Sequence, residues 1–275
     1  MKEKIFEFLS KNWQSILLGL LAGVLVLQIV SLVRKSTSGD VLDAASITDW
    51  GLSFQGKAGN PPVAPVSATD LKAYQGYYIG DTSQKTLYLT FDAGYENGNA
   101  SEILDALKKT NVPAAFFLTG NYFKTSPELV RRMKSEGHTV ANHTMTHPNM
   151  AAISSLENFR VELEEVEKLY YSVTGEPMQK IYRPPQGKFS LENLKQAQLL
   201  GYRTVFWSLA YVDWKNDAQP DPDKAMEKLM GRVHNGAVIL LHLTSETNAK
   251  IMERFITECR AQGYEFAPID DLFAS

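Results

Sequence analysis

Residues 86–93 read Thr-Leu-Tyr-Leu-Thr-Phe-Asp-Ala, an apolar run that ends on a carboxylate. Short runs rich in aromatic and β-branched residues favour a buried strand, so we expect a strand over 86–91. Residues 99–109 then show a helical pattern with one apolar face. The same order repeats to the C-terminus, with strands expected at 114–118, 138–142, 180–183, 203–208, 237–241 and 266–269, and helices at 126–135, 155–173, 191–200, 222–233 and 246–262.

Seven strands that alternate with six helices predict an α/β fold built on a parallel sheet. At this chain length, the pattern allows a closed or nearly closed (β/α) barrel or an open doubly wound sheet. No glycine-rich phosphate-binding fingerprint follows the first strand, which disfavours a dinucleotide-binding domain.

The composition disfavours a nucleic-acid-binding protein and excludes sites or cross-links built from several cysteines. A net charge of -3, without a long basic run, provides no electrostatic footprint for nucleic acid. Cys259 is the only cysteine of the 275 residues, so neither an internal disulfide nor a cysteine-based metal cage can form. We expect this thiol to be buried and inert, because free cysteine behaves as a small apolar side chain.

The N-terminus predicts a membrane anchor. Residues 16–33 carry no charge over 18 positions, which as a helix gives about 27 Å, close to the hydrocarbon thickness of a bilayer. Arg34 and Lys35 follow instead of a small-residue cleavage site, which favours an uncleaved anchor over a signal peptide. A small excess of lysine before the segment places residues 1–35 as a cytoplasmic terminus plus anchor, with the remaining chain outside the cell membrane.

Residues 36–84 are rich in Ser, Gly, Ala and Pro and show no helical period. We interpret them as a linker that continues into a segment wrapped on the domain, because Trp50, Leu52 and Phe54 are rare in free linkers. The strand–helix alternation is expected to form one domain over residues 85–275.

Chemistry-bearing residues stand where the predicted strands end. Asp92 follows the first strand and Arg183 ends the fourth; His242 ends the sixth. In a (β/α) barrel these positions share the C-terminal rim, where active sites lie. Each residue alone has a structural explanation, such as a strand-end cap, a rigid turn or a core histidine, but these do not explain their joint occurrence.

His143 and His147 follow the third strand at a spacing of four residues. On a helical turn this spacing places both imidazoles on one face, where they can reach one cation. Asp213 and Trp214 follow the fifth strand, as either a helix cap with a packed indole or part of the same site.

Residues 85–273 resemble the polysaccharide deacetylases of the NodB-homology type, carbohydrate esterase family 4, whose fold is a distorted (β/α) barrel. The resemblance lies in five ordered motifs: Thr90-Phe-Asp92, His143-Thr-Met-Thr-His147, Arg183-Pro-Pro-Gln-Gly187, Asp213-Trp214 and Leu240-Leu-His242.

This resemblance implies a metal-dependent hydrolase of amide bonds on carbohydrate. It implies that a divalent cation, zinc first among the candidates, binds His143 and His147. It further implies four catalytic residues and three substrate-binding residues. The catalytic set is Asp92 as base, Arg183 as its partner, His242 as acid and Asp213 as the partner of His242, and the substrate-binding set is Tyr95, Gln186 and Trp214.

Two positions depart from the family pattern, since Ala93 and Ala210 stand where aspartates are usual. The change at Ala93 leaves the two histidines as the only protein ligands implied for the metal. The stretch Thr90-Phe-Asp-Ala-Gly-Tyr-Glu-Asn97 resembles the branch that makes muramic δ-lactam in spore cortex. That branch acts on N-acetylmuramic acid in peptide-stripped peptidoglycan.

Three hypotheses for the function of this protein therefore remain open. It is a muramic acid deacetylase of this branch, another family 4 enzyme such as a peptidoglycan N-acetylglucosamine deacetylase, or a membrane-tethered glycan-binding protein without activity. In each case we expect a monomer that binds peptidoglycan glycan strands and no nucleic acid.

Overall fold

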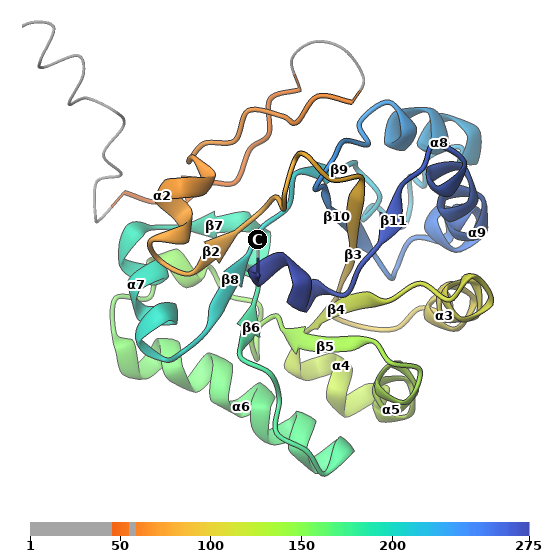
Figure 1. Cartoon of the computed structure of the whole chain (residues 1–275). Helices are drawn as coiled ribbons and strands as arrows, with labels where there is room; N and C mark the ends of the chain where they lie inside the picture. Colours follow the sequence, from red (N-terminus) through yellow and green to blue (C-terminus); the bar gives the residue numbers. More distant parts are fainter. Residues whose placement is uncertain (1–45, 55–58, 275) are drawn as a thin grey trace, which may run out of the picture. The chain divides into compact units, whose positions relative to one another are not determined.

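A curled sheet of parallel strands organises the chain (Figure 1). The structure, a computed structural model, describes residues 46–54 and 59–274. The strand order is β2-β8-β6-β5-β4-β3-β10-β9, and β11 pairs with β3. The strands are β2 (Gly76–Tyr77), β3 (Thr86–Ala93), β4 (Ala114–Leu118), β5 (Thr139–Asn142), β6 (Ile181–Tyr182), β8 (Arg203–Val205), β9 (Leu209–Ala210), β10 (Val238–His242) and β11 (Glu265–Phe266).

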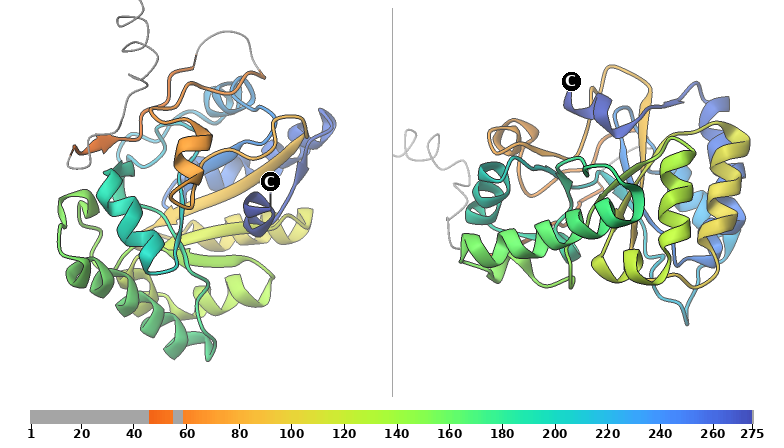
Figure 2. Two further views of the ribbon diagram at one scale, coloured as in Figure 1. Left: turned by 60° about the vertical axis from the view of Figure 1, so that its left-hand side comes forward. Right: turned by 90° about the horizontal axis from the view of Figure 1, so that it is seen from below.

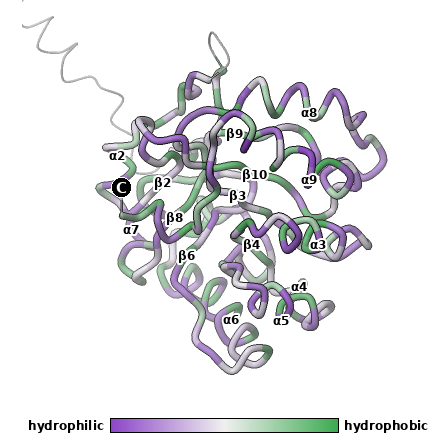
Figure 3. Tube along the Cα trace, turned by 45° about the vertical axis from the view of Figure 1, so that its right-hand side comes forward, coloured by the Kyte–Doolittle hydropathy of each residue, from purple (hydrophilic) through white to green (hydrophobic). Residues whose placement is uncertain are grey.

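Helices cover the outer face of this sheet (Figures 1 and 2). The helices are α2 (Ala68–Lys72), α3 (Ala100–Thr110), α4 (Gly120–Thr125), α5 (Pro127–Ser135), α6 (Leu156–Thr174), α7 (Leu191–Leu199), α8 (Pro222–Met230) and α9 (Glu246–Ala261). Along their length the colours alternate between hydrophilic and hydrophobic, as expected of helices with one buried face (Figure 3).

Local signals define where the helices begin and end. The hydroxyls of Ser155 and Ser245 accept backbone N–H groups in the first turns of α6 and α9. Gly175 closes α6 in the left-handed conformation that glycine adopts without strain. Asp221 caps α8, so the alternative of Asp213 as a helix cap is wrong.

The predicted alternation of strands and helices is confirmed, with all seven strands and all six helices near their expected positions. The sequence did not predict the short elements α2, α4, β2 and β9, nor the two-residue strands at Thr48–Asp49 and Lys188–Phe189. Within the described residues no strand pairing joins β2 to β9, so the sheet curls as a half-barrel. A single antiparallel bridge between Ile79 and Ala237 links the segment after β2 to the start of β10.

Strand register decides which side chains meet at the rim. Asp92 on β3 pairs in register with His242 on β10 and with Phe117 on β4. Asn142, the last residue of β5, pairs with Leu118 and with Tyr182 on β6. Because every pairing in this sheet is parallel, the chemistry-bearing residues after these strands emerge at one edge.

The segment before the barrel packs on it, as the aromatic residues of the sequence predicted. β1 (Thr48–Asp49) pairs antiparallel with β7 (Lys188–Phe189). The Trp50 side chain is 5% exposed and stacks on Phe206 with ring centroids 4.3 Å apart.

The proposed anchor, residues 16–33, lies outside the described residues. No helix in the described part of the chain is long and apolar enough to cross a membrane.

Candidate active site

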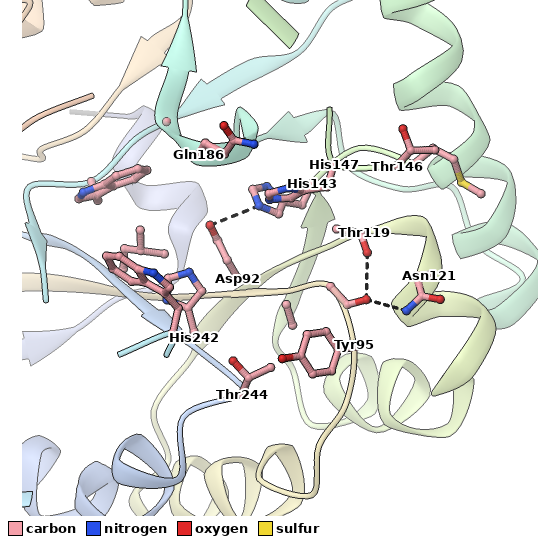
Figure 4. A pocket seen from close by; sticks show the side chains of 17 residues that line it. Asp92, Tyr95, Thr119, Asn121, His143, Thr146, His147, Gln186, His242 and Thr244 are labelled. Carbon is pink, nitrogen blue, oxygen red and sulfur yellow. Dashed lines mark hydrogen bonds and ion pairs between the residues drawn. The ribbon is translucent and has the colours of Figure 1, made fainter. Parts of the chain in front are cut away.

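One cavity of about 710 Å³ opens at the carboxyl ends of the central strands. Asp92, His143, His147 and His242 line it, as the sequence predicted. Figure 4 shows Asp92 between the paired imidazoles of His143 and His147 on one side and His242 on the other. The residues after β3, β5 and β10 are thus brought together in one cleft.

A buried ion pair fixes the Asp92 carboxylate. Nη1 of Arg183 donates to Oδ1 of Asp92 at 2.7 Å, while its other nitrogens donate to the Thr90 hydroxyl at 2.9 Å and the Val205 carbonyl at 3.1 Å. Burial would raise the pKa of Asp92, but the charges of Arg183 and the nearby histidines lower it below its ordinary value. Asp92 is therefore an ionised carboxylate whose Oδ2 faces Nε2 of His143 at 3.6 Å.

His143 and His147 do not lie on a helical turn, and this part of the sequence interpretation was wrong. No helix spans 143–147, and Thr144 and His147 have φ angles of 70° and 59°. The Asn142 side chain accepts the N–H of Thr144 at 2.9 Å, and the Thr144 hydroxyl accepts the N–H of His147 at 3.0 Å. These side-chain acceptors take the N–H groups that a helix would have paired with backbone carbonyls.

Residues 143–147 form a loop, called the histidine loop below, and helix α6 holds its C-terminal half. The Glu162 carboxylate accepts the backbone N–H of Thr146 at 2.9 Å and its hydroxyl at 2.7 Å. The Glu162 carbonyl accepts the N–H of Met145 at 2.9 Å. The loop is thereby held at both ends without helical hydrogen bonds.

The histidine pair has the chemistry of a divalent-cation site. The ring centroids of His143 and His147 lie 4.9 Å apart. Nδ1 of His143 is 2.9 Å from the Arg183 carbonyl; since a carbonyl only accepts, Nδ1 carries the hydrogen and Nε2 keeps its lone pair. Burial lowers the pKa of His143 to about 4 and also lowers the pKa of His147, so both are neutral near pH 7.

Two neutral imidazoles fit a divalent cation that completes its shell with water or substrate. Within the described ranges, no group of three His, Cys, Asp or Glu side chains is arranged to hold a metal. Ala93 lines the cavity and contributes no oxygen ligand from its side chain.

On the opposite side of Asp92, a second buried carboxylate controls His242. Oδ1 of Asp213 lies 2.7 Å from Nδ1 of His242, and Oδ2 accepts the His242 backbone N–H at 2.8 Å. Burial alone would lower the pKa of His242, but the charge and hydrogen bond of Asp213 raise it above its ordinary value. Because Nδ1 is held by Asp213, Nε2 of the imidazole faces away from that carboxylate.

The sequence analysis missed two residues that support this pair. Asn248, buried in the first turn of α9, donates to Oδ2 of Asp213 at 2.7 Å and to the His242 carbonyl at 3.1 Å. The Tyr211 hydroxyl donates to the Asn248 side chain. A polar residue three positions after the Ser245 cap was the available signal, but it does not reveal a partner 35 residues earlier.

The three predicted substrate-binding residues also line the cavity. The Trp214 ring is half exposed, with its centroid 5.6 Å from that of His242. Tyr95 is 46% exposed, and its hydroxyl accepts a hydrogen bond from Asn216. Gln186 adopts a φ of 60° in the turn between β6 and β7.

Comparisons with known proteins identify the family of this chain. The sequence profile described as polysaccharide deacetylase matches residues 79–205. The peptidoglycan-N-acetylmuramic acid deacetylase PdaA of Bacillus subtilis is 40% identical over 224 residues, which are 82% of this chain and 85% of that protein.

Two solved structures described as family 4 carbohydrate esterases are also similar. That of Bacillus subtilis PdaA gives a TM-score of 0.77 at 40% identity and covers 83% of this chain and 97% of its own. One from Bacillus anthracis gives 0.68 at 40% identity and covers 83% and 96%. The family resemblance seen in the five motifs is therefore confirmed: this chain belongs to the polysaccharide deacetylases, carbohydrate esterase family 4.

Proposed function

We propose that this protein hydrolyses the N-acetyl group of N-acetylmuramic acid residues in peptide-stripped peptidoglycan. The freed amine then condenses with the lactyl carboxyl group to give the muramic δ-lactam of spore cortex. The observation that carries the proposal is the placement of Asp92, whose pKa is lowered, and His242, whose pKa is raised, on two sides of one cavity. The named relative of 40% identity supports the choice of muramic acid as substrate.

Asp92 acts as the general base in this scheme. Amide hydrolysis needs a water nucleophile that loses its proton as it attacks the acetyl carbon. Arg183 keeps the carboxylate ionised and fixes Oδ1, so Oδ2 is the oxygen available to accept that proton. Because Arg183 is fully buried and hydrogen-bonded on three sides, it orients the base and does not touch the substrate.

His242 acts as the general acid. The amine leaves only after its nitrogen is protonated, and an imidazolium can supply that proton. Asp213 favours the charged imidazole and fixes its orientation through Nδ1, leaving Nε2 to donate. The C–N bond breaks, and acetate and the free amine are the products.

His143 and His147 would hold a divalent cation, with zinc as our first expectation. When bound, such a cation supplies Lewis acidity to the acetamide oxygen and lowers the pKa of a water molecule beside Asp92. We propose that the protein's own contribution to the oxyanion comes from a backbone N–H near Gln186, and that Trp214 forms a wall of the acetyl pocket.

We further propose that residues 16–33 anchor a monomeric enzyme in the cell membrane with its catalytic domain outside. Protease treatment of intact cells should then remove the catalytic domain and leave an N-terminal fragment in the membrane fraction. Recovery of the protein in the cytosol would contradict this arrangement.

Acetate release tests the substrate assignment directly. We expect release from peptide-free glycan strands, detected together with the new amine or lactam by mass spectrometry, and little from intact peptidoglycan or xylan. Treatment with a chelator should abolish release, and added Zn²⁺ should restore it. Acetate from glucosamine residues alone would instead favour a peptidoglycan N-acetylglucosamine deacetylase, and glycan binding without acetate would favour a binding protein.

Asp92→Asn provides the matching test of the base. The asparagine keeps the shape of the side chain but cannot accept the water proton, so we expect turnover to fall by at least about 10³-fold. Circular dichroism should show an unchanged fold, and substantial remaining turnover would refute the assignment.

A further inference from the structure

Trp50 lies before the part of the chain that the family profile matches, which begins at residue 79. Its indole nevertheless contacts the active-site wall. Nε1 of Trp50 donates to the Trp207 carbonyl at 2.8 Å, and its backbone N–H donates to the Gly187 carbonyl at 2.9 Å. Both acceptor residues line the cavity.

The carbonyl that accepts from Trp50 is the last of three consecutive backbone carbonyls, and the first two accept from Arg183, the proposed partner of Asp92. Three successive carbonyls, starting at the last residue of β8, accept hydrogen bonds from buried side chains: Val205 and Phe206 from Arg183, at 3.1 and 3.4 Å, and Trp207 from Trp50. The backbone of residues 205–207 therefore positions both the Arg183 guanidinium, which binds Asp92, and the Trp207 indole in the cavity wall. Trp50 supplies the hydrogen bond at the cavity end of this segment.

Trp50, Gly187 and Trp207 are closely packed against one another. Gly187 has a φ of 66°, and a Cβ placed there would lie 2.7 Å from the Trp207 ring and 3.0 Å from Cβ of Trp50. The Trp50 ring also stacks on Phe206 and contacts the Phe189 ring edge-on, with centroids 4.3 and 5.9 Å away. Displacement of Trp50 therefore moves the wall itself, because close-packed neighbours transmit such shifts.

We propose that Trp50 is a positioning residue of the active site: it fixes the wall formed by Gly187 and Trp207 against which the sugar bearing the acetamide binds. The inference rests on the proposed deacetylase function. It makes the segment that precedes the family domain part of the substrate-binding apparatus, so that the pocket is incomplete without it.

Trp50→Phe tests the proposal, since phenylalanine keeps a ring on Phe206 but removes the N–H that reaches the Trp207 carbonyl. A wall that contacts the sugar in both ground and transition states contributes uniform binding, so its loss raises KM and leaves kcat nearly unchanged. We expect KM for short peptide-free glycans to rise roughly tenfold, with kcat within about twofold. A purely structural role would lower the fraction of folded enzyme, which reduces apparent kcat without changing KM.

Phe54→Leu is the matched control, because Phe54 lies on the same segment but stacks on Arg232, outside the cavity lining. Its KM should equal that of the wild type. Two further measurements do not require turnover. Glycan affinity in the Asp92→Asn background, by calorimetry, should weaken roughly tenfold with Trp50→Phe. Amide exchange should rise over 186–189 and 205–208 while the melting temperature changes little.

The outcomes separate the two claims. If wild-type protein releases no acetate from any glycan, the proposed function fails, and the affinity and exchange measurements still test Trp50. If the wild type is active and Trp50→Phe has wild-type KM, affinity and local exchange, the inference about Trp50 is wrong. Should Trp50→Phe fold poorly, Trp50→His, which retains a ring N–H, must restore a near-normal KM, and its failure to do so would also overturn the inference.

Discussion

At the scale of single residues, the site separates two ionisable groups by their surroundings. Asp92 and His242 are neighbours in register across β3 and β10, yet each has its own buried partner of opposite charge. Arg183 lowers the pKa of Asp92, whereas Asp213 raises the pKa of His242. These partners shift the two pKa values in opposite directions, which favours an ionised carboxylate and a charged imidazole in the same cavity.

The pH dependence of activity follows from His242. Burial lowers its pKa, Asp213 and Asp92 raise it, Arg183 lowers it, and the net shift is upward. The acid is lost as pH rises through this raised pKa, so the alkaline limb of kcat/KM should lie above about pH 6.5, the ordinary value for histidine. Asp213→Asn removes the main raising charge and should move this limb to lower pH. A pH–rate profile whose limb does not move would show that another group supplies the proton.

Much of this residue-level chemistry could be predicted from the sequence. Asp92, His143 and His242 follow apolar strands, and parallel strands bring such positions to one edge. Asn248 could not be predicted in the same way, because its partner Asp213 is fixed by how α9 packs beside the loop after β9, and no local pattern records that contact.

At the scale of elements, the histidine loop shows where periodicity misleads. A spacing of four residues fits a helical turn, but it says nothing about competing acceptors. The side chains of Asn142 and Thr144 accept hydrogen bonds from backbone N–H groups of the loop. The Glu162 side chain on α6 accepts another, from Thr146. The two imidazoles still meet, because left-handed residues bend the loop back on itself.

Helix α6 should consequently influence metal affinity. Glu162→Ala removes both hydrogen bonds to Thr146 and frees one end of the loop that carries the ligands. Loss of such supporting contacts commonly costs about 10–100-fold in metal affinity, and we expect a loss in that range by titration calorimetry with Zn²⁺. Glu164→Ala is the control, since Glu164 pairs with Arg160 on the same helix. Equal affinities for the two variants would show that the loop holds its shape without α6.

The start of α4 packs tightly against the histidine loop. Gly120 has no room for a side chain, since a Cβ there would lie 2.1 Å from Sδ and 2.9 Å from the carbonyl oxygen of Met145. Gly120→Ala should therefore displace the histidine loop and weaken Zn²⁺ binding by calorimetry. Gly98→Ala is the comparison, as a Cβ there meets no atom within 4 Å, although its φ of 104° also strains alanine. Metal affinity should fall in the first variant and be retained in the second.

At the scale of the whole molecule, the long elements could be predicted and the closure of the sheet could not. The apolar runs of β3, β4 and β10 are buried on both faces, and such runs are typical of parallel strands. β2 and β9 have two residues each, too few for any period. Whether the barrel closes depends on these two edge strands, so the sequence left a closed barrel and an open sheet as alternatives.

The buried guanidinium of Arg183 ties the two halves of this curled sheet together. From the end of β6 it reaches Asp92 and Thr90 on β3 and the Val205 carbonyl on β8, and its charge lies 4.0 Å from the centre of the Phe117 ring on β4. The proposed role of Arg183 as partner of the base thus coincides with a structural role. Breaking one side of a buried pair leaves an uncompensated charge, which typically costs about 3–5 kcal/mol.

We therefore expect Arg183→Met to lower the free energy of unfolding by about 3 kcal/mol in urea titrations. In the double variant Asp92→Asn/Arg183→Met the orphaned carboxylate is gone, so the loss should be smaller than the sum of the two single losses. The difference isolates the coupling between the two charges from the methylene packing that methionine retains. Strictly additive losses would mean that Arg183 stabilises the sheet through its contacts with β8 and Phe117 and not through its charge on Asp92.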